Sequence, residues 1–164
     1  MNLSSIHAMI EAPLARVAAW LVTPAALAAR SYVSWVFLHS GWLKLSDWGQ
    51  TLALFQTEYR VPLLTPMLAA TVGTGGELLF GGLVALGLFG RAGALGLLAV
   101  NAMAVLSFRH VLLADGFEAA LAQHVLWAVL LAALALYGPG RLSIDGLALS
   151  TAASAPSRSD PMTS

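Results

Sequence analysis

The 164-residue chain contains no cysteine and few charged side chains. Without cysteine it can form neither disulfides nor the thiolate-ligated zinc and iron–sulfur centres found in many redox proteins. Charged residues make up 10% of the chain and balance to a net charge of zero. A protein that binds nucleic acid needs a clustered basic surface. We therefore expect no nucleic-acid partner and no chemistry based on thiols.

Apolar residues, in contrast to charged ones, are abundant. The chain is 59% hydrophobic, with a mean hydropathy of +0.80. An ordinary soluble domain is about 45–50% apolar and about 25% charged. Both departures favour lipid as the solvent, so the sequence predicts an integral membrane protein whose first partner is the lipid bilayer.

Four apolar segments are long enough to cross a membrane as helices, which requires about 20 residues each. They cover residues 25–45, 66–89, 92–108 and 119–137. Gly90-Arg91 and the stretch Gly138-Pro139-Gly140-Arg141 end helices sharply, as glycine and proline do. The predicted fold is an all-α membrane protein, a four-transmembrane-helix bundle within a domain over residues 25–148.

The flanking and connecting segments are more polar. Residues 1–24 carry apolar side chains three and four residues apart, typical of an amphipathic helix on the membrane surface, although a loosely ordered leader fits equally well. Thr23 and Pro24 would cap and start the first span. Residues 46–63 predict a short interfacial helix ending near Pro62, and residues 149–164 predict a disordered tail.

Four spans place both termini on one side of the membrane. Basic residues concentrate on the cytoplasmic side of membrane proteins. The terminal side would hold Arg16, Arg30, Arg91, Arg141 and Arg158, and the opposite side Lys44, Arg60 and Arg109. This bias favours cytoplasmic N- and C-termini, with Lys44 reaching the interface from the end of its span.

Glu77 is the one acidic residue within the second span. It shares a helical face with Gly73, Gly81 and Val84, and small residues allow a neighbouring helix to approach closely. We therefore expect Glu77 to face the bundle interior. Its role is either structural, paired with Arg30 or hydrogen-bonded to Asn101 or His124, or chemical, as a group that handles protons or contacts a ligand.

Histidines could ligate haem or copper. His39, His110 and His124 show no spacing typical of a metal site, and each is more simply a satisfied polar residue near the headgroups. His124 is the best candidate because it lies within a span. His39 is on the opposite side of its helix from Arg30, so only one of the two can face the bundle centre.

Several short motifs occur in the order and spacing of a known family. They are Arg30 followed by His39-Ser-Gly-Trp-Leu-Lys44, Phe55 with Tyr59 and Pro62, Pro66 with Glu77-Leu-Leu, Gly87-Leu-Phe-Gly-Arg91, His124 with Trp127, and Gly138-Pro-Gly-Arg141 with Asp145. Over residues 27–146 the chain resembles the DoxX family. The resemblance implies a four-helix protein of the bacterial inner membrane, related to the small subunit of thiosulfate:quinone oxidoreductase or terminal quinol oxidase. Relatives are associated with membrane oxidoreductase complexes.

The leading hypothesis is therefore a subunit of a membrane redox system that interacts with quinone or with a redox partner protein in the membrane or periplasm. Glu77 would be the catalytic group, and Arg30, His39, Asn101 and His124 would contact the cofactor. Quinone is the favoured cofactor, ahead of haem or copper. The alternative is a non-enzymatic scaffold or accessory protein for small-molecule or metal handling, and a second copy of the chain is a further possible partner.

Overall fold

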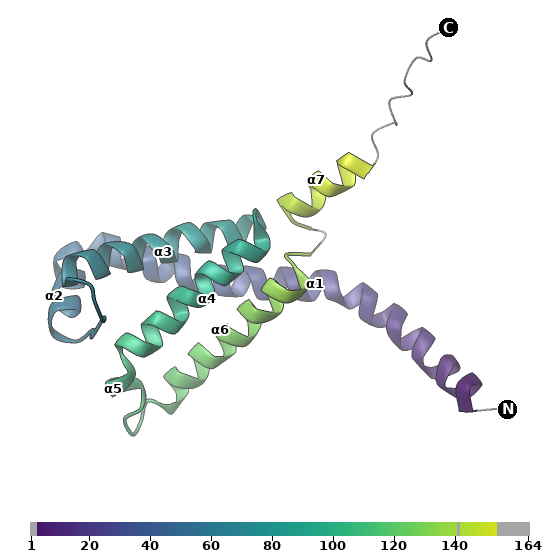
Figure 1. Ribbon diagram of the computed structural model, residues 1–164, viewed down its shortest axis with the longest axis horizontal. Helices are drawn as coiled ribbons and strands as arrows, with labels where there is room; N and C mark the ends of the chain where they lie inside the picture. The colour runs from purple at the N-terminus through teal and green to yellow at the C-terminus, as the bar shows by residue number, and fades with distance from the viewer. Residues whose placement is uncertain (1–2, 141, 154–164) are drawn as a thin grey trace, which may run out of the picture.

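The computed structural model describes residues 3–140 and 142–153, and this part of the chain is helical with no β-strand. The helices are α1 (Leu3–Ser46), α2 (Trp48–Thr57), α3 (Pro66–Leu86), α4 (Gly90–Ser107), α5 (Arg109–Leu112), α6 (Glu118–Tyr137) and α7 (Ile144–Ala153). Four of them, α1, α3, α4 and α6, are long and apolar enough to cross a membrane. The all-α bundle of four spans is thus confirmed (Figure 1).

The structure corrects where the first spanning helix begins. Helix α1 continues through Pro13 and Pro24 rather than beginning at Thr23, and its candidate span covers Glu11–Ser46, 36 residues. At 1.5 Å per residue this is about 54 Å of helix, against roughly 30 Å of hydrocarbon. A proline removes one backbone hydrogen bond and bends a helix without having to end it. The N-terminal part of α1 consequently extends beyond the bundle (Figure 1).

Local caps explain where the next two helices begin. Asp47 Oδ1 accepts the Gln50 N–H at 2.9 Å and starts α2, which ends at Thr57, earlier than the expected Pro62. Thr65 Oγ1 accepts the Leu68 N–H at 3.4 Å, and Pro66 occupies the first turn of α3. Each cap satisfies a backbone donor that a helix leaves open at its start.

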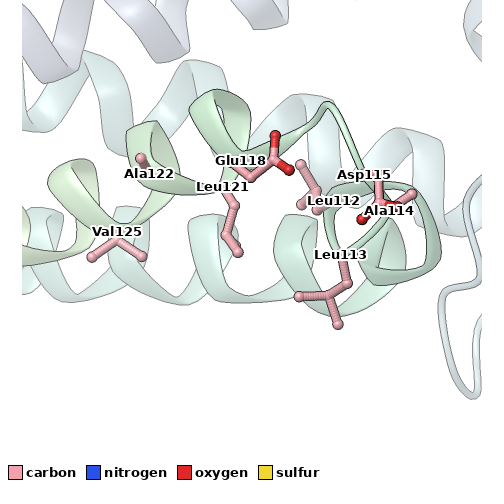
Figure 2. Close-up of a pocket in the computed structure, with 8 residues that line it drawn as sticks. All are labelled: Leu112, Leu113, Ala114, Asp115, Glu118, Leu121, Ala122 and Val125. Atoms are coloured by element: carbon pink, nitrogen blue, oxygen red, sulfur yellow. The ribbon is translucent and has the colours of Figure 1, made fainter.

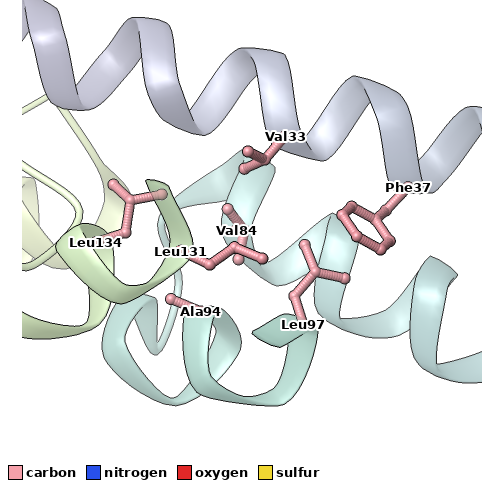
Figure 3. Packing of buried hydrophobic residues seen from close by; sticks show 7 residues of the cluster. All are labelled: Val33, Phe37, Val84, Ala94, Leu97, Leu131 and Leu134. Carbon is pink, nitrogen blue, oxygen red and sulfur yellow. The ribbon is translucent and has the colours of Figure 1, made fainter. Parts of the chain in front are cut away.

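The spans alternate in direction, so the long N-terminal helix and α7 leave the bundle at the same end (Figure 1). Four helices contribute to the main core at this end: α1 gives Val33 and Phe37, α3 gives Val84, α4 gives Ala94 and Leu97, and α6 gives Leu131 and Leu134 (Figure 3). A smaller cluster of Phe55, Ala69 and Ala70 joins α2 to the start of α3. The α1–α3 pair and the α4–α6 pair diverge from the main core towards α2 and α5.

Small residues bring α1 and α3 together. Gly81 lies against the Leu38 side chain, where an added Cβ would be 3.2 Å from Cγ. At Gly41 an added Cβ would be 2.8 Å from Leu78 Cγ. Glu77, Gly81 and Val84 are buried and Gly73 is half-buried, which confirms the inward face expected for α3. Such close contact is how transmembrane helices associate when lipid offers no hydrophobic driving force.

The turn between α3 and α4 is held by the segment that follows α6. Asp145 accepts the Phe89 N–H at 3.1 Å through Oδ1 and the Gly90 N–H at 2.8 Å through Oδ2, capping the start of α4. Gly87 ends α3 with φ of +63°. Helix α7 extends to Ala153, into the region expected to be a disordered tail, and residues 154–164 of that tail lie outside the described residues.

Candidate functional site

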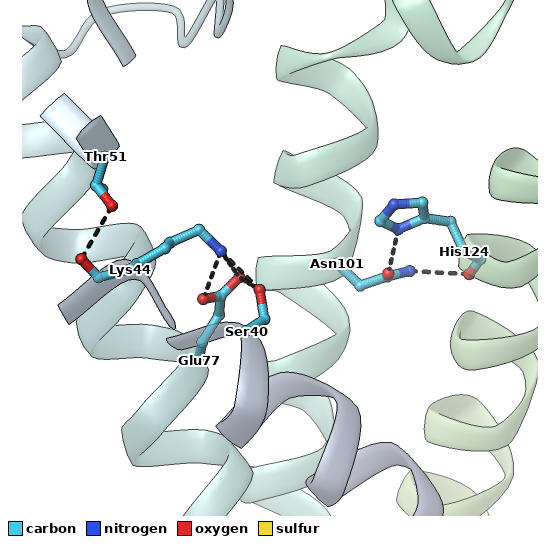
Figure 4. A network of polar contacts seen from close by, with 6 residues as sticks. All are labelled: Ser40, Lys44, Thr51, Glu77, Asn101 and His124. Carbon is cyan, nitrogen blue, oxygen red and sulfur yellow. Dashed lines mark hydrogen bonds and ion pairs between the residues drawn. The ribbon is translucent and has the colours of Figure 1, made fainter. Parts of the chain in front are cut away.

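Lys44 of α1 and Glu77 of α3 form an ion pair inside the bundle (Figure 4). Lys44 Nζ lies 2.7 Å from Glu77 Oε1 and 2.8 Å from Oε2. Nζ also donates to Ser40 Oγ at 2.7 Å, and the Ser40 hydroxyl donates to Glu77 Oε1 at 3.3 Å. The three N–H groups of an ammonium are thus all engaged. The lysine and glutamate side chains are only 21% and 10% exposed, so each charge depends on its partner rather than on solvent.

This pair corrects two expectations. Lys44 does not reach outward to the interface but turns inward to Glu77, and Arg30 is not the partner of Glu77. Arg30 donates instead to the carbonyl oxygens of Pro139 at 3.1 Å and Leu142 at 2.7 Å. The reason is distance along α1: Arg30 and Lys44 are 14 residues apart, or about 21 Å of helix. Arg30 therefore belongs to the end of the bundle that holds the α3–α4 turn.

A cavity of about 530 Å³ adjoins the ion pair. Ligand pockets in proteins are typically about 300–1,000 Å³, so its size suits a small organic molecule. Its polar wall includes Ser40, Lys44 and Glu77, and its other walls come from α2, the loop after it, α4 and α6. Glu77 therefore faces a space that could hold a ligand.

Aromatic side chains line two sides of this cavity. Phe55, Tyr59 and Phe108 follow one another, with ring centroids 4.7 Å and 5.1 Å apart. Across the cavity, Trp127 contacts Phe37 at 5.6 Å. Rings at these separations form favourable aromatic pairs, and the exposed ring faces can stack on a planar ligand.

Tyr59 follows α2 in the segment that connects the spans α1 and α3, and its side chain lines the cavity. Burial raises the pKa of its phenol, and the negative charge of Glu77 raises it further. The phenol therefore stays protonated at physiological pH and can either donate or accept a hydrogen bond.

Part of the cavity lining on α3 and α4 is exposed on the outside of the bundle. Val72 and Met103 line the cavity and yet expose 57% and 43% of their surface. Gly76 faces Val100 across the seam between the two helices, and Val72 comes one turn earlier on α3. This exposed side of the cavity therefore lies within the candidate spans, where the surroundings are lipid.

His124, which lines the cavity, and the buried Asn101 behind it form a second polar pair (Figure 4). His124 Nδ1 is 2.8 Å from Asn101 Oδ1, and Asn101 Nδ2 donates to the His124 carbonyl oxygen at 3.1 Å. Neither residue hydrogen-bonds to Glu77 in the described structure, contrary to one expectation. The His124 ring also contacts the edge of Trp127, with centroids 4.8 Å apart. Sequence spacing placed both residues within spans, and the fold pairs them with each other.

The other histidines lie outside the cavity. His39 is exposed and stacks on Trp35 at 5.6 Å, on the opposite side of α1 from the buried Arg30. His110 is exposed at the end of the bundle and contacts Phe108. Among the described residues, no group of three or more His, Asp or Glu side chains is placed to hold a metal ion.

A second hollow, of about 410 Å³, lies between α5 and the start of α6 (Figure 2). Its lining is apolar except for Asp115 and Glu118, both exposed. Glu118 accepts the Gly116 N–H at 3.2 Å and so closes the loop. None of the expected site residues contributes to this hollow.

Sequence reasoning missed the role of Lys44 and the contribution of Tyr59. A signal for Lys44 was present, because it shares a helical face with Arg30, Ser34 and Gly41, and small residues mark the side of a helix that packs inward. Its place near the end of the apolar run obscured that signal. Tyr59 lies after the end of α2, and the path of the loop brings it to the cavity. The spacing of apolar residues within helices does not predict the path of a loop.

The sequence model of the DoxX family matches residues 25–110. No curated protein and no solved structure matches the chain. The match includes the part of α1 with Ser40 and Lys44, all of α3 with Glu77, and all of α4 with Asn101, whereas α6 with His124 and Trp127 lies beyond it. Because the match covers 86 of 164 residues and the fold has four apolar spans, this chain is a multi-pass membrane protein of the DoxX family.

Proposed function

We propose that the protein is a subunit of a membrane redox system, which binds a quinone-type ring in the cavity beside Lys44 and Glu77. The observation that carries the proposal is the cavity itself, an aromatic-walled space of about 530 Å³ with one buried ion pair on its wall. Quinones carry electrons and protons between membrane redox proteins, and the family's connection with quinone enzymes favours this ligand class.

The walls suit the two parts of such a ligand. A planar ring would stack on Tyr59 or its aromatic neighbours, while its polar groups would reach Glu77 and His124. The isoprenoid tail would pass the exposed side of the cavity at Val72 and Met103 into lipid. Lys44 would keep Glu77 ionised, so that a Glu77 oxygen can accept a hydrogen bond from the ring.

Inner-membrane location and cytoplasmic termini are part of this proposal, as is a partner protein that exchanges electrons with the bound ligand. Arg30 and His39, expected among the cofactor contacts, are not part of the proposed site. Arg30 is engaged by the segment after α6, and His39 faces outward.

Binding of decylubiquinone to the detergent-purified protein tests the proposal, with native mass spectrometry of the extracted protein to detect endogenous quinone. Gly73→Leu adds a side chain on the cavity wall, where Phe55 lies 3.6 Å from an added Cβ. Gly75→Leu, two residues along the same helix, is the matched control because an added Cβ there meets nothing within 4 Å. We expect Gly73→Leu to weaken binding by at least about tenfold through lost space, and Gly75→Leu to leave it unchanged.

If the purified wild-type protein neither contains nor binds a quinone, the alternative function as a non-enzymatic scaffold or accessory protein is favoured. One observation already fits that alternative: all three N–H groups of Lys44 are used within the chain, as in a purely structural ion pair. Co-purification of a partner protein without quinone binding would then identify the scaffold role.

A further inference from the structure

The hydrogen bonds of Asn101 fix the protonation of the His124 ring. Asn101 Nδ2 must face the His124 carbonyl oxygen, because the reverse orientation would oppose two oxygens at 3.1 Å. Asn101 Oδ1 therefore faces His124 Nδ1, and a hydrogen bond at 2.8 Å requires the proton on Nδ1. A charged imidazole without a carboxylate partner is costly within a span, so the ring is neutral and Nε2 carries a bare lone pair.

The other polar groups on the cavity wall have also used their donors. Lys44 donates to Glu77 and Ser40, and Ser40 donates to Glu77. Ser107 Oγ donates to the Met103 carbonyl oxygen at 2.7 Å, and Trp127 Nε1 donates to the Tyr32 hydroxyl at 3.3 Å. The Tyr59 hydroxyl can rotate to donate or accept and so does not discriminate. His124 lines the cavity, and its second ring nitrogen lies on the side of the ring away from Asn101 (Figure 4). The hydrogen-bonding capacity that the wall offers to a ligand is therefore mostly that of acceptors, at Glu77 and His124 Nε2.

From this inventory we propose that the cavity selects the hydroxyl-bearing form of a ring ligand over its carbonyl form, and that Asn101 is the positioning residue that sets this preference. The inference rests on the proposed function. A ring hydroxyl donates its hydrogen to His124 Nε2, whereas a ring carbonyl would oppose its own lone pair to that of Nε2. Buried acceptors left without donors disfavour the oxidised ligand.

Binding of decylubiquinol and decylubiquinone to the full-length purified protein, measured anaerobically side by side, tests the preference. We expect the reduced form to bind about tenfold more tightly, the effect of one hydrogen bond. His124→Phe keeps a ring against Trp127 but removes the acceptor, so the ratio of the two affinities should fall towards one. Asn101→Leu should lower the same ratio, because without Asn101 Oδ1 the His124 proton is no longer held on Nδ1 and can move to Nε2. Gly75→Leu, outside the cavity, should leave it unchanged.

Nitrogen-15 NMR of the histidine-labelled protein gives a readout that does not depend on ligand, with the His124 signals assigned by their loss in His124→Phe. The chemical shifts should show protonated Nδ1 and unprotonated Nε2, and Nε2–H as the dominant form would overturn the inference. Equal binding of the two forms, or tighter binding of decylubiquinone, overturns the inference while the proposed function stands. Absence of binding by either form refutes both.

Discussion

At the scale of single residues, the Lys44–Glu77 pair serves both stability and the proposed chemistry. Glu77 is buried and Lys44 half-buried, their charged groups contact each other at 2.7 Å, and Ser40 supplies the remaining hydrogen bonds. Removing one member of a buried pair leaves the other charge without a partner and destabilises the protein. Replacing both members with apolar residues of similar volume is often neutral or stabilising. Single and double substitutions therefore separate the two roles.

Glu77→Leu alone should destabilise the protein, by up to about 3 kcal/mol, the lower end of the range for a buried pair, because the half-buried Lys44 is left without its partner. The double variant Lys44→Met with Glu77→Leu should regain most of this stability but bind decylubiquinol at least about tenfold more weakly, because one acceptor is lost. Thermal unfolding in detergent and equilibrium binding measure the two effects. If the double variant binds like the wild type, the pair is structural and Glu77 does not contact the ligand.

At the scale of elements, the turn from α3 to α4 depends on contacts from distant parts of the chain. Arg30 of α1 reaches the carbonyl oxygens of Pro139 and Leu142, and Asp145 caps α4. Gly87, with φ of +63°, lies where an added Cβ would clash with the guanidinium of Arg30. The fold thus places Gly90 and Arg91 of this turn against Gly138 and Pro139, two stretches that the sequence indicated as helix ends.

Asp145→Ala should cost about 0.5–2 kcal/mol, the usual range for a lost helix cap, since it removes the acceptors of the Phe89 and Gly90 N–H groups. The fall in thermal midpoint, measured with the protein in detergent, checks the effect. Ligand affinity should stay the same because the cavity lies elsewhere in the bundle. A thermal midpoint equal to that of the wild type would show that the cap contributes nothing.

Gly87→Ala should be more harmful than an alanine at a helical glycine, because it combines a left-handed backbone with a clash against Arg30 and Ser143. Gly82→Ala is the matched control, with nothing within 4 Å of an added Cβ on the same helix. Thermal unfolding should show a clear loss for Gly87→Ala and no loss for Gly82→Ala. Equal stability of the two variants would contradict the role given to the turn.

At the scale of the whole molecule, the fold sharpens the argument on orientation. Lys44 is engaged inside the bundle, and Arg30 is buried against backbone carbonyl oxygens at its end, so neither belongs in a count of exposed interfacial charges. By their position in the sequence, Arg16, Arg91, Arg141 and Arg158 fall in the terminal segments and the turn between the second and third spans, and Arg60 and Arg109 fall in the loops on the opposite side. The excess still favours cytoplasmic termini.

Because the chain has no cysteine, single substitutions can report the topology without background labelling. Leu63→Cys and Leu113→Cys place thiols in exposed loops at one end, and Tyr137→Cys places one at the exposed C-terminal end of α6. With a membrane-impermeant maleimide, we expect the first two to react in intact cells with a permeabilised outer membrane, and Tyr137→Cys to react only after lysis. The opposite pattern would invert the proposed orientation, and labelling of all three from one side would contradict the alternating spans.

The sequence by itself determined the membrane location, the four helices and the inward face of Glu77. Lipid leaves a spanning segment no external partner for its backbone, so long apolar runs must become helices, and small residues mark the sides that pack. Only the tertiary structure decided which basic residue meets Glu77 and which groups share the cavity. Those outcomes depend on the shift of α1 along α3 and on its rotation. Contacts between distant segments, Gly41 against Leu78 and Gly81 against Leu38, set both of these. Helical periodicity fixes faces within one helix but carries no information about the register between two.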